Sequence, residues 1–153
     1  MKIFFKSLML ISVCLGLSAT VNAKTFRYAT TGDILGLDPH ANNEGPTNTM
    51  KGNIYGRMLH RKADLSLEPD LATKWEKLDA NTWRFSLRRG VKFHNGNDFN
   101  ADDVLFSYKR QTQEASDMSF ALATIKQINK VDDYTVDLIT KGPDPVLLLN
   151  MPM

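Results

Sequence analysis

The chain has 153 residues, 42% of them hydrophobic, with 19 basic and 17 acidic side chains. This composition is enough for one modest globular domain, and the near balance of charge gives no support to a nucleic-acid or anionic-membrane partner. The single cysteine, Cys14, excludes a framework of internal disulfides.

The first 23 residues have the pattern of a secretory signal peptide. Lys2 and Lys6 form a basic start, and the stretch from Leu8 to Leu17 is apolar. This stretch is about ten residues long, whereas a membrane-spanning helix needs roughly 20. Val21-Asn22-Ala23 then supplies small residues at the two positions that a signal peptidase reads, which predicts cleavage after Ala23.

A lipoprotein signal at Cys14 is the alternative to cleavage after Ala23. Val13 is bulkier than the residue expected before a lipidated cysteine, and the apolar run continues beyond Cys14, so we favour the cleaved signal. Its removal leaves 130 residues with 17 basic and 17 acidic side chains and no cysteine. The pI of 8.7 for the whole chain therefore says little about partners of the exported part.

The exported part begins with a predicted strand, Thr25–Thr30, with Phe26 and Tyr28 on one face. Residues 31–46 follow as a long irregular segment containing three glycines and two prolines. Most connections in compact domains have about 4 to 6 residues, and longer ones are often functional. The segment is thus either functional or a surface connection.

A helix is predicted from Thr47, because Met50, Ile54 and Met58 share one face. Gly52 and Gly56 weaken this helix, each by about 1 kcal/mol relative to alanine. They indicate either close packing against another backbone or a shorter helix.

Two hairpins and a capped helix are predicted next. Lys74–Leu78 and Thr82–Arg88 alternate around a turn, which places Trp75 and Trp83 on one buried face. Asn100 has the position of a helix cap, followed by acidic residues 102–103, and by Val104, Leu105 and Tyr108 on the predicted core face.

The second hairpin is predicted from Ile125–Val131 and Tyr134–Thr140. Residues 114–120 before it are polar and predicted to be irregular. Near the end, Asp144 and Pro145 indicate a helix start with Asp144 as cap and Pro145 in the first turn. The apolar run after it stops within four residues, which suggests a truncated chain. The order of elements predicts a mixed α/β fold.

The sequence contains no pattern typical of catalysis or metal binding. The histidines His40, His60 and His94 are not at metal-ligand spacing, so no metal and no cofactor are expected. Asp102 and Asp103 point about 100° apart on a helix and do not form a carboxylate pair. Ser66, Ser86 and Ser107 do not lie in a nucleophile elbow, and Gly32, Gly36 and Gly45 do not form a phosphate loop.

Arg84, Arg88, Arg89 and Lys92 form a basic cluster. Since the exported part is neutral, we interpret it as a solvated hairpin edge rather than a nucleic-acid site. Two classes of function remain from the residues alone. The chain is either an exported module that binds a solute or the N-terminal part of an exported hydrolase with catalytic residues beyond Met153.

A long ordered motif favours the solute-binding module over the hydrolase, because it resembles the signature of a known family. Its residues are Trp83-x-Phe85-x-Leu87-Arg88-x-Gly90-Val91-Lys92-Phe93-His94-x-Gly96, then Phe99-x-Ala101-x-Asp103-Val104-x-Phe106-Ser107. It resembles the signature of the peptide/nickel-type extracellular solute-binding proteins of bacterial ATP-binding-cassette (ABC) importers, family 5. Gly36–Pro39, Pro69–Trp75 and Asp133–Val136 are also similar to that family, so the resemblance runs from Phe26 to Leu149.

The resemblance implies an α/β periplasmic-binding-protein-like fold of type II, in the large peptide-binding subclass, with a mixed sheet. Members have two lobes that close on a ligand. Residues 1–23 would be the signal peptide, 24–64 the start of lobe I, and 65–153 a β-rich subdomain of that lobe, with the second lobe absent. His94 would be structural.

The resemblance also implies the function and its partners. The chain would be a non-enzymatic, monomeric periplasmic protein that delivers a peptide or small solute to an inner-membrane ABC permease. The positions expected to reach the ligand are Asn42, Asn43, Glu44, Gly45 and Pro46. Asn95, where members often have Asp, and the short link 97–99 weaken assignment to one solute. Dipeptides, oligopeptides, nickel complexes, haem, opines and sugars are all compatible with the family.

Overall fold

The computed structural model describes Thr25 and residues 27–151 of the chain. The chain divides into two units, residues 1–30 and 31–153, and each is described by itself. The predicted signal peptide, Cys14 and Phe26 lie outside the described residues. In the first unit, residues 27–30 form no strand, so the strand predicted at Thr25–Thr30 is wrong there. A strand requires a neighbour to pair with, and both sheets in the described part pair strands from Leu59 onward.

The second unit begins with an irregular segment and helix α2, Gly45–Gly52. The helix predicted from Thr47 to Met58 is therefore wrong at both ends. Pro46 occupies the first turn, where its missing N–H breaks no helical hydrogen bond. Gly52 ends the helix, and an added Cβ there would clash with the Arg57 guanidinium. The alternative of a shorter helix marked by the glycines is confirmed.

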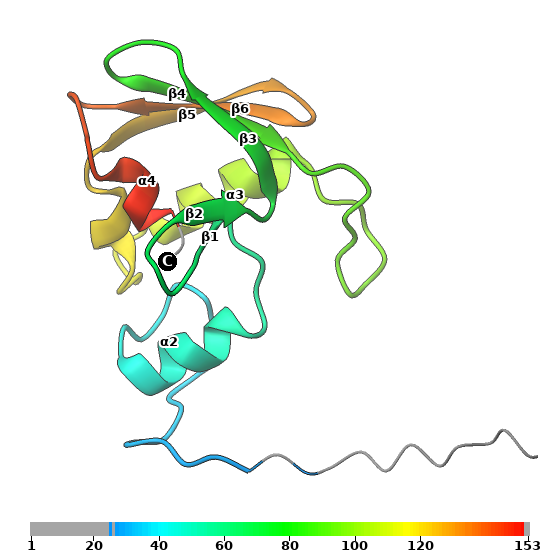
Figure 1. Ribbon diagram of the computed structural model, residues 1–153, viewed down its shortest axis with the longest axis vertical. Coiled ribbons are helices and arrows are strands. Elements are labelled where there is room, and N and C mark those ends of the chain that lie inside the picture. The colour runs from blue at the N-terminus through cyan, green and yellow to red at the C-terminus, as the bar shows by residue number, and fades with distance from the viewer. Residues whose placement is uncertain (1–24, 26, 152–153) are drawn as a thin grey trace, which may run out of the picture. The chain divides into compact units, whose positions relative to one another are not determined.

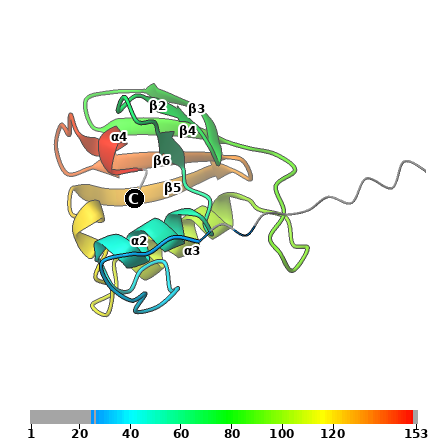
Figure 2. The same ribbon diagram turned by 60° about the horizontal axis from the view of Figure 1, so that its bottom comes forward.

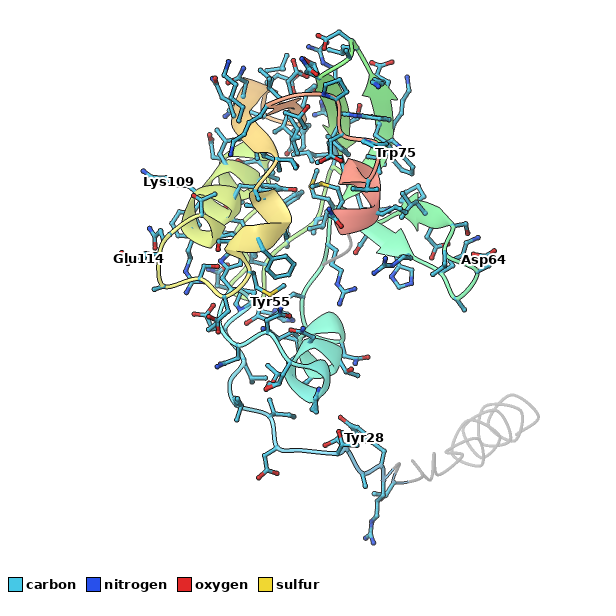
Figure 3. The ribbon with its side chains drawn as sticks, turned by 90° about the vertical axis from the view of Figure 1, so that its left-hand side faces the viewer. Tyr28, Tyr55, Asp64, Trp75, Lys109 and Glu114 are labelled. Atoms are coloured by element: carbon cyan, nitrogen blue, oxygen red, sulfur yellow. The ribbon has the colours of Figure 1, made fainter. Side chains whose placement is uncertain are left out.

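A small hairpin that the sequence did not predict follows α2. Strands β1, Leu59–Arg61, and β2, Leu67–Pro69, pair antiparallel. Figure 3 shows Asp64 at the tip of this hairpin, pointing away from the rest of the unit. Asp64 accepts hydrogen bonds from both the backbone N–H and the hydroxyl of Ser66, at 3.0 and 2.6 Å, which closes the turn.

A four-stranded sheet with the order β3-β4-β6-β5 forms the main layer of the unit (Figure 1). Its strands are β3, Ala72–Lys77; β4, Thr82–Leu87; β5, Ile125–Asp132; and β6, Thr135–Thr140. Both hairpins predicted from the sequence are confirmed. The resemblance implied a mixed sheet, whereas every strand pair among the described residues is antiparallel.

Helix α3, Ala101–Gln111, lies across one face of this sheet (Figure 2). The predicted cap is confirmed: Asn100 Oδ1 accepts from the Asp102 N–H at 2.7 Å, and the Asp103 carboxylate accepts from the Asn100 N–H at 2.9 Å. Val104 is buried, and Leu105 and Tyr108 pack against the core, as predicted.

The core lies between the sheet and its covering elements. Phe85, Leu138 and Val136 of the sheet are at most 2% exposed, as are Leu59 of β1 and Leu147 of α4. Trp75 and Trp83 pack against this cluster from one sheet face, as predicted. Figure 3 labels Trp75, which comes from β3.

Two short helices complete the described part. The 3₁₀ helix η1, Ser119–Leu122, occupies the end of a segment predicted to be irregular. Helix α4, Leu147–Asn150, has Val146 at its N-cap, so the predictions of Asp144 as cap and of Pro145 in the first turn are both wrong. Asp144 still accepts the Val146 N–H, at 3.0 Å, and also the Thr124 hydroxyl, which orders the chain before the helix. Within the described residues, no helix is long and apolar enough to cross a membrane.

The motif residues 88–98 form a loop that projects beyond the sheet (Figure 1). A bridge between Lys92 and Asp98 ties its two arms together, and their side chains form an ion pair at 2.6 Å. Gly90 and Gly96 both have positive φ, at 74° and 90°, which suits glycine. His94 is exposed on this loop.

The basic cluster predicted at this edge is divided among several partners. Arg84 forms a two-point ion pair with Asp137 across strands β4 and β6, at 2.7 and 2.8 Å. Arg88 donates to the Asp70 carbonyl, and the Arg89 guanidinium lies 4.1 Å from the Tyr134 ring centre. Arg88 and Arg89 are exposed, as expected for a solvated hairpin edge, whereas Arg84 lies on β4, an inner strand of the sheet.

Candidate functional site

Residues 35–46 are in contact with α2, with α3 and with the turn after α3. At one end, the Asp38 carboxylate accepts from both terminal nitrogens of Arg110 on α3, one of them at 2.7 Å. This hydrogen-bonded guanidinium holds the pKa of Asp38 well below its usual range, and the backbone N–H of His40 adds to the effect. The segment is thereby fastened to the polar side of α3.

His40 is buried beneath this ion pair, and burial lowers the pKa of its imidazole. Arg110 lowers the pKa further, because its Nη1 lies 3.1 Å from His40 Nδ1. The Arg110 guanidinium can only donate, so Nδ1 must accept, and a neutral imidazole then carries its proton on Nε2. His40 is a structural histidine of this segment.

The proximity of Ser107 to His40 does not create a nucleophile. Ser107 Oγ lies 3.4 Å from His40 Nε2, which superficially resembles a serine–histidine pair. A general base would have to accept the serine proton at Nε2. With Nδ1 accepting from Arg110, Nε2 is a donor and cannot do so. The geometry therefore does not support serine catalysis at this position.

Helix α2 fastens the other side of the segment. The buried Thr47 hydroxyl accepts the Leu35 N–H at 3.1 Å. Lys51, only 5% exposed, donates to the carbonyl oxygens of Ala41 and Asn42 at 2.6 and 2.9 Å. Tyr55, just beyond the helix, donates from its hydroxyl to the Leu37 carbonyl at 2.8 Å (Figure 3).

The turn after α3 provides a third set of contacts. The buried Ser116 hydroxyl donates to the His40 carbonyl at 3.2 Å. The Asp117 carboxylate accepts the Asn42 N–H at 3.0 Å. Residues 35–42 are therefore held by side chains from α2, α3 and this turn, although they have no regular secondary structure.

The five residues predicted to reach a ligand are contiguous but not equivalent. Asn42 is in the left-handed region, with φ of 56°, and both its backbone N–H and its carbonyl are bound within the unit. Asn43 is exposed, and its Oδ1 accepts from the Asn48 side chain. Gly45 and Pro46, predicted to lie in a loop, are the first two residues of α2. Pro46 can begin a helix because its first-turn N–H is not needed.

Glu44 is the charged residue of this group. It stands at the N-cap position of α2, but its side chain makes no capping hydrogen bond. Its Oε1 atom is shielded from solvent and has no hydrogen-bond partner in the described part of the chain. A shielded carboxylate oxygen without a donor is unfavourable unless a donor is supplied from elsewhere.

Two hollows border α3. The smaller, of about 50 Å³, is lined by Asp38, His40, Arg110 and Ser116 among others, and has room for water rather than for a solute. The larger, of about 310 Å³, lies between the helix and β5. Leu105, Tyr108, Leu122, Ile125 and Ile128 supply its apolar lining, with Lys109 and Lys126 beside them. Neither hollow is lined by any of the residues 42–46.

Other candidate groups serve the fold. His60 lies 3.9 Å from Glu68 on the exposed face of the β1–β2 hairpin. Asp102 pairs with Lys130 at 2.8 Å, while Asp103 caps α3, so the two carboxylates act separately. The described residues contain no group of three or more His, Cys, Asp and Glu side chains that could hold a metal ion.

The sequence did not identify the residues that hold the candidate segment. Lys51, Arg110, Ser116 and Asp117 carry no motif, and their partners are 9 to 76 residues away in the chain. The one available signal was Asp38 within the Gly36–Pro39 motif. An acidic residue in an irregular segment indicates a cationic partner, but not which one.

Comparison with known proteins identifies the family. A model of the bacterial extracellular solute-binding proteins, family 5 Middle, matches residues 66–153. The dipeptide-binding protein of Escherichia coli (strain K12) is 32% identical over 163 residues, covering 92% of this chain and 30% of that protein.

Solved structures show the same fold. The PBP/SBP MoaA of A. tumefaciens R10, in complex with mannopinic acid, is 33% identical with a TM-score of 0.70, over 76% of this chain and 25% of MoaA. The periplasmic binding protein DppA of Helicobacter pylori, in complex with the peptide STSA, is 31% identical with a TM-score of 0.66, over 76% of this chain and 27% of DppA. The chain spans less than a third of the length of each of these three proteins. The described fold is thus part of a periplasmic-binding-protein fold, and the chain belongs to the bacterial extracellular solute-binding proteins of family 5.

Proposed function

We propose that the chain forms part of the solute-binding component of an ABC importer, which captures a peptide or similar small solute in the periplasm. The observation that carries this proposal is the 32% identity to a dipeptide-binding protein over 92% of the chain. The family and the relatives described above are binding proteins, which favours a non-enzymatic role. His40 Nε2 donates to Ser107 and so cannot accept its proton, which also favours a non-enzymatic role.

The partners follow from the same relatives. DppA of H. pylori is associated with an ABC transporter and was solved with a peptide, which supports a membrane permease as partner and a peptide as solute. MoaA was solved with mannopinic acid, so a solute other than a peptide is also compatible with the proposal. The remaining parts of the proposal are a monomeric protein, exported by a signal peptide cleaved after Ala23, with residues 24–64 and 65–153 as two parts of the first lobe.

The proposed solute contacts are Asn42, Asn43, Glu44, Gly45 and Pro46. Glu44 is the most informative of them, because it is the one charged side chain of the five and makes no capping hydrogen bond. An ammonium group, such as the N-terminus of a peptide, would be a partner of opposite charge for its carboxylate. Asn43 is exposed and offers its amide beside it.

Calorimetric titration of the full-length protein with the dipeptide Ala-Ala tests the proposal. Binding without hydrolysis is expected, and Glu44→Gln should weaken it, since the amide keeps the shape but loses the charge. Glu68→Gln, on the β1–β2 hairpin, is the matched control. Hydrolysis of the dipeptide that disappears on substituting one nucleophile would instead establish the exported hydrolase.

Residues 24–153 alone are expected to bind Ala-Ala poorly, because a cleft between two lobes needs both walls. Micromolar binding by this fragment would contradict the two-lobed proposal.

A further inference from the structure

Lys51 is a buried lysine whose charge is met by backbone carbonyls rather than by a carboxylate. Lys51 is only 5% exposed, and its Nζ donates to the Ala41 and Asn42 carbonyls. Among the described residues it forms no ion pair. A buried ammonium is strongly unfavourable without hydrogen bonds, so these two carbonyls supply what the folded position of Lys51 requires.

The Asn42 backbone is bound by an anion as well as by the Lys51 cation. Its N–H donates to the Asp117 carboxylate at 3.0 Å, while its carbonyl accepts from Lys51 at 2.9 Å. The residue is in the left-handed conformation, which is uncommon for a residue other than glycine. Both polar groups of its backbone are therefore held, by a cation from α2 and an anion from the turn after α3.

The next residue, Asn43, is held less firmly. Its side chain makes an exposed contact with Asn48, whereas the Glu44 carbonyl already accepts the Asn48 N–H at 2.9 Å as the start of α2. The path of Asn43 between Asn42 and the helix thus depends on how the Asn42 backbone is held. An added Cβ at Gly36 would lie 3.3 Å from Asn42 Oδ1, so a larger residue at position 36 would crowd the Asn42 side chain.

We propose that Lys51 is a positioning residue for solute binding, acting with Asp117 as a clamp on Asn42. The clamp fixes the path of the chain into Asn43, Glu44 and the first turn of α2 before the solute arrives. Such preorganisation raises affinity by removing the ordering of a segment from the free energy of binding. The inference rests on the proposed function, in which Asn42 to Pro46 contact the solute.

Two measurements on the full-length protein test the clamp: the dissociation constant for Ala-Ala and hydrogen exchange of the Asn42 amide. Lys51→Met keeps the aliphatic stem and removes the ammonium, while Lys51→Arg keeps a cation that can donate to carbonyls. Lys62→Met, at an exposed lysine in the β1–β2 turn, is the matched control. We expect Lys51→Met to weaken binding by about tenfold, because the backbone of about one residue would then have to be ordered on binding, and to speed Asn42 exchange. Lys51→Arg should restore part of both, and Lys62→Met should change neither.

Exchange of the Phe85 and Leu138 amides separates positioning from general stability. Both residues lie in central strands of the sheet, so their amides should keep their exchange rates in Lys51→Met. Equal acceleration at Asn42 and in the sheet would mean that Lys51 only stabilises the fold, which overturns the proposal. Faster exchange at Asn42 with unchanged affinity would overturn it as well.

Asp117→Ala provides a second route if Lys51→Met does not fold. Asp117 is exposed, and its loss removes the other half of the clamp without leaving a buried charge. The same pattern of weaker binding and faster Asn42 exchange is expected, and unchanged values would contradict the clamp. If the unsubstituted protein binds no Ala-Ala, the proposed function fails for dipeptides, whereas exchange at Asn42 still decides whether Lys51 holds the segment.

Discussion

The four-stranded sheet and the segment 35–46 are held by opposite kinds of contact. The sheet is held by apolar burial around Phe85, Val136 and Leu138, each at most 2% exposed. The segment has no strand or helix before Gly45, and is held by hydrogen bonds to side chains of three other elements. Apolar packing is not directional and stabilises a whole layer. Hydrogen bonds are directional and place individual atoms, which is what a binding segment requires.

Helix α3 belongs to both regions. Val104 and Tyr108 face the sheet, and the hydroxyl of Tyr108 donates to the Met151 sulfur. Ser107 and Arg110 on the same helix face His40 and Asp38 of the segment. Substitutions in the sheet, in the segment and in α3 should therefore have distinguishable consequences.

The largest effect is expected from a cavity in the sheet. Phe85→Ala removes a ring that is 0% exposed and should lower the free energy of unfolding by about 3–5 kcal/mol. Urea unfolding followed by circular dichroism measures this. The control is Phe106→Ala, because Phe106 is 69% exposed. Equal losses in the two variants would show that the sheet core does not dominate stability.

The cap of α3 should affect both regions. Asn100→Ala removes the side-chain acceptor for the Asp102 N–H and should lower the free energy of unfolding by about 1 kcal/mol. Hydrogen exchange should quicken at the first turn of α3, and the same urea experiment gives the global loss. Asn97→Ala, in the exposed loop, should have little effect. A loss as large as that of Phe85→Ala would mean that Asn100 does more than cap the helix.

The ion pair that fastens the segment should have a smaller global effect. Asp38 and Arg110 side chains are each more than a third exposed, so Arg110→Met should lower the free energy of unfolding by less than about 1 kcal/mol. The expected change is local. Hydrogen exchange should become faster at the His40 amide, whose N–H donates to the Asp38 carboxylate, and should not become faster in the sheet. Lys109→Met is the neighbouring control. Uniformly faster exchange would remove the distinction between the two regions.

The smallest expected effect is a pH dependence from His40. Burial lowers its folded pKa below the ordinary 6.5, so the unfolded chain takes up a proton first as pH falls. Stability contributed by neutral His40 is complete above pH 6.5 and declines as pH falls below that value. Melting temperatures at pH 7.5 and 5.5 should differ less in His40→Gln than in the unsubstituted chain. His94→Gln, at an exposed site, should leave the difference unchanged.

The sequence predicts best those elements in which residues close together in the chain interact. The cap at Asn100 and the turn between β5 and β6 involve residues two or three apart, although the turn lies at Asp133-Tyr134, one residue later than predicted. Strand alternation placed Trp75 and Trp83 correctly. Prediction failed where an element depends on distant partners. The helix predicted through Met58 ends at Gly52, and the β1–β2 hairpin has strands of only three residues with no clear alternation.

The sequence by itself determined the mixed α/β character, both main hairpins, the start of α3 and, through the motif from Trp83 to Ser107, the family. These features depend on local hydrogen bonds and on period-two alternation, which can be read along the chain. Only the tertiary structure decided how residues 35–46 are held. Arg110, Ser116 and Asp117 bind backbone and side chains 72 to 76 residues earlier, and such directional contacts leave no periodic pattern in the sequence. For the same reason, only the structure showed that Lys51 is buried and bound to the backbone beside the proposed solute contacts.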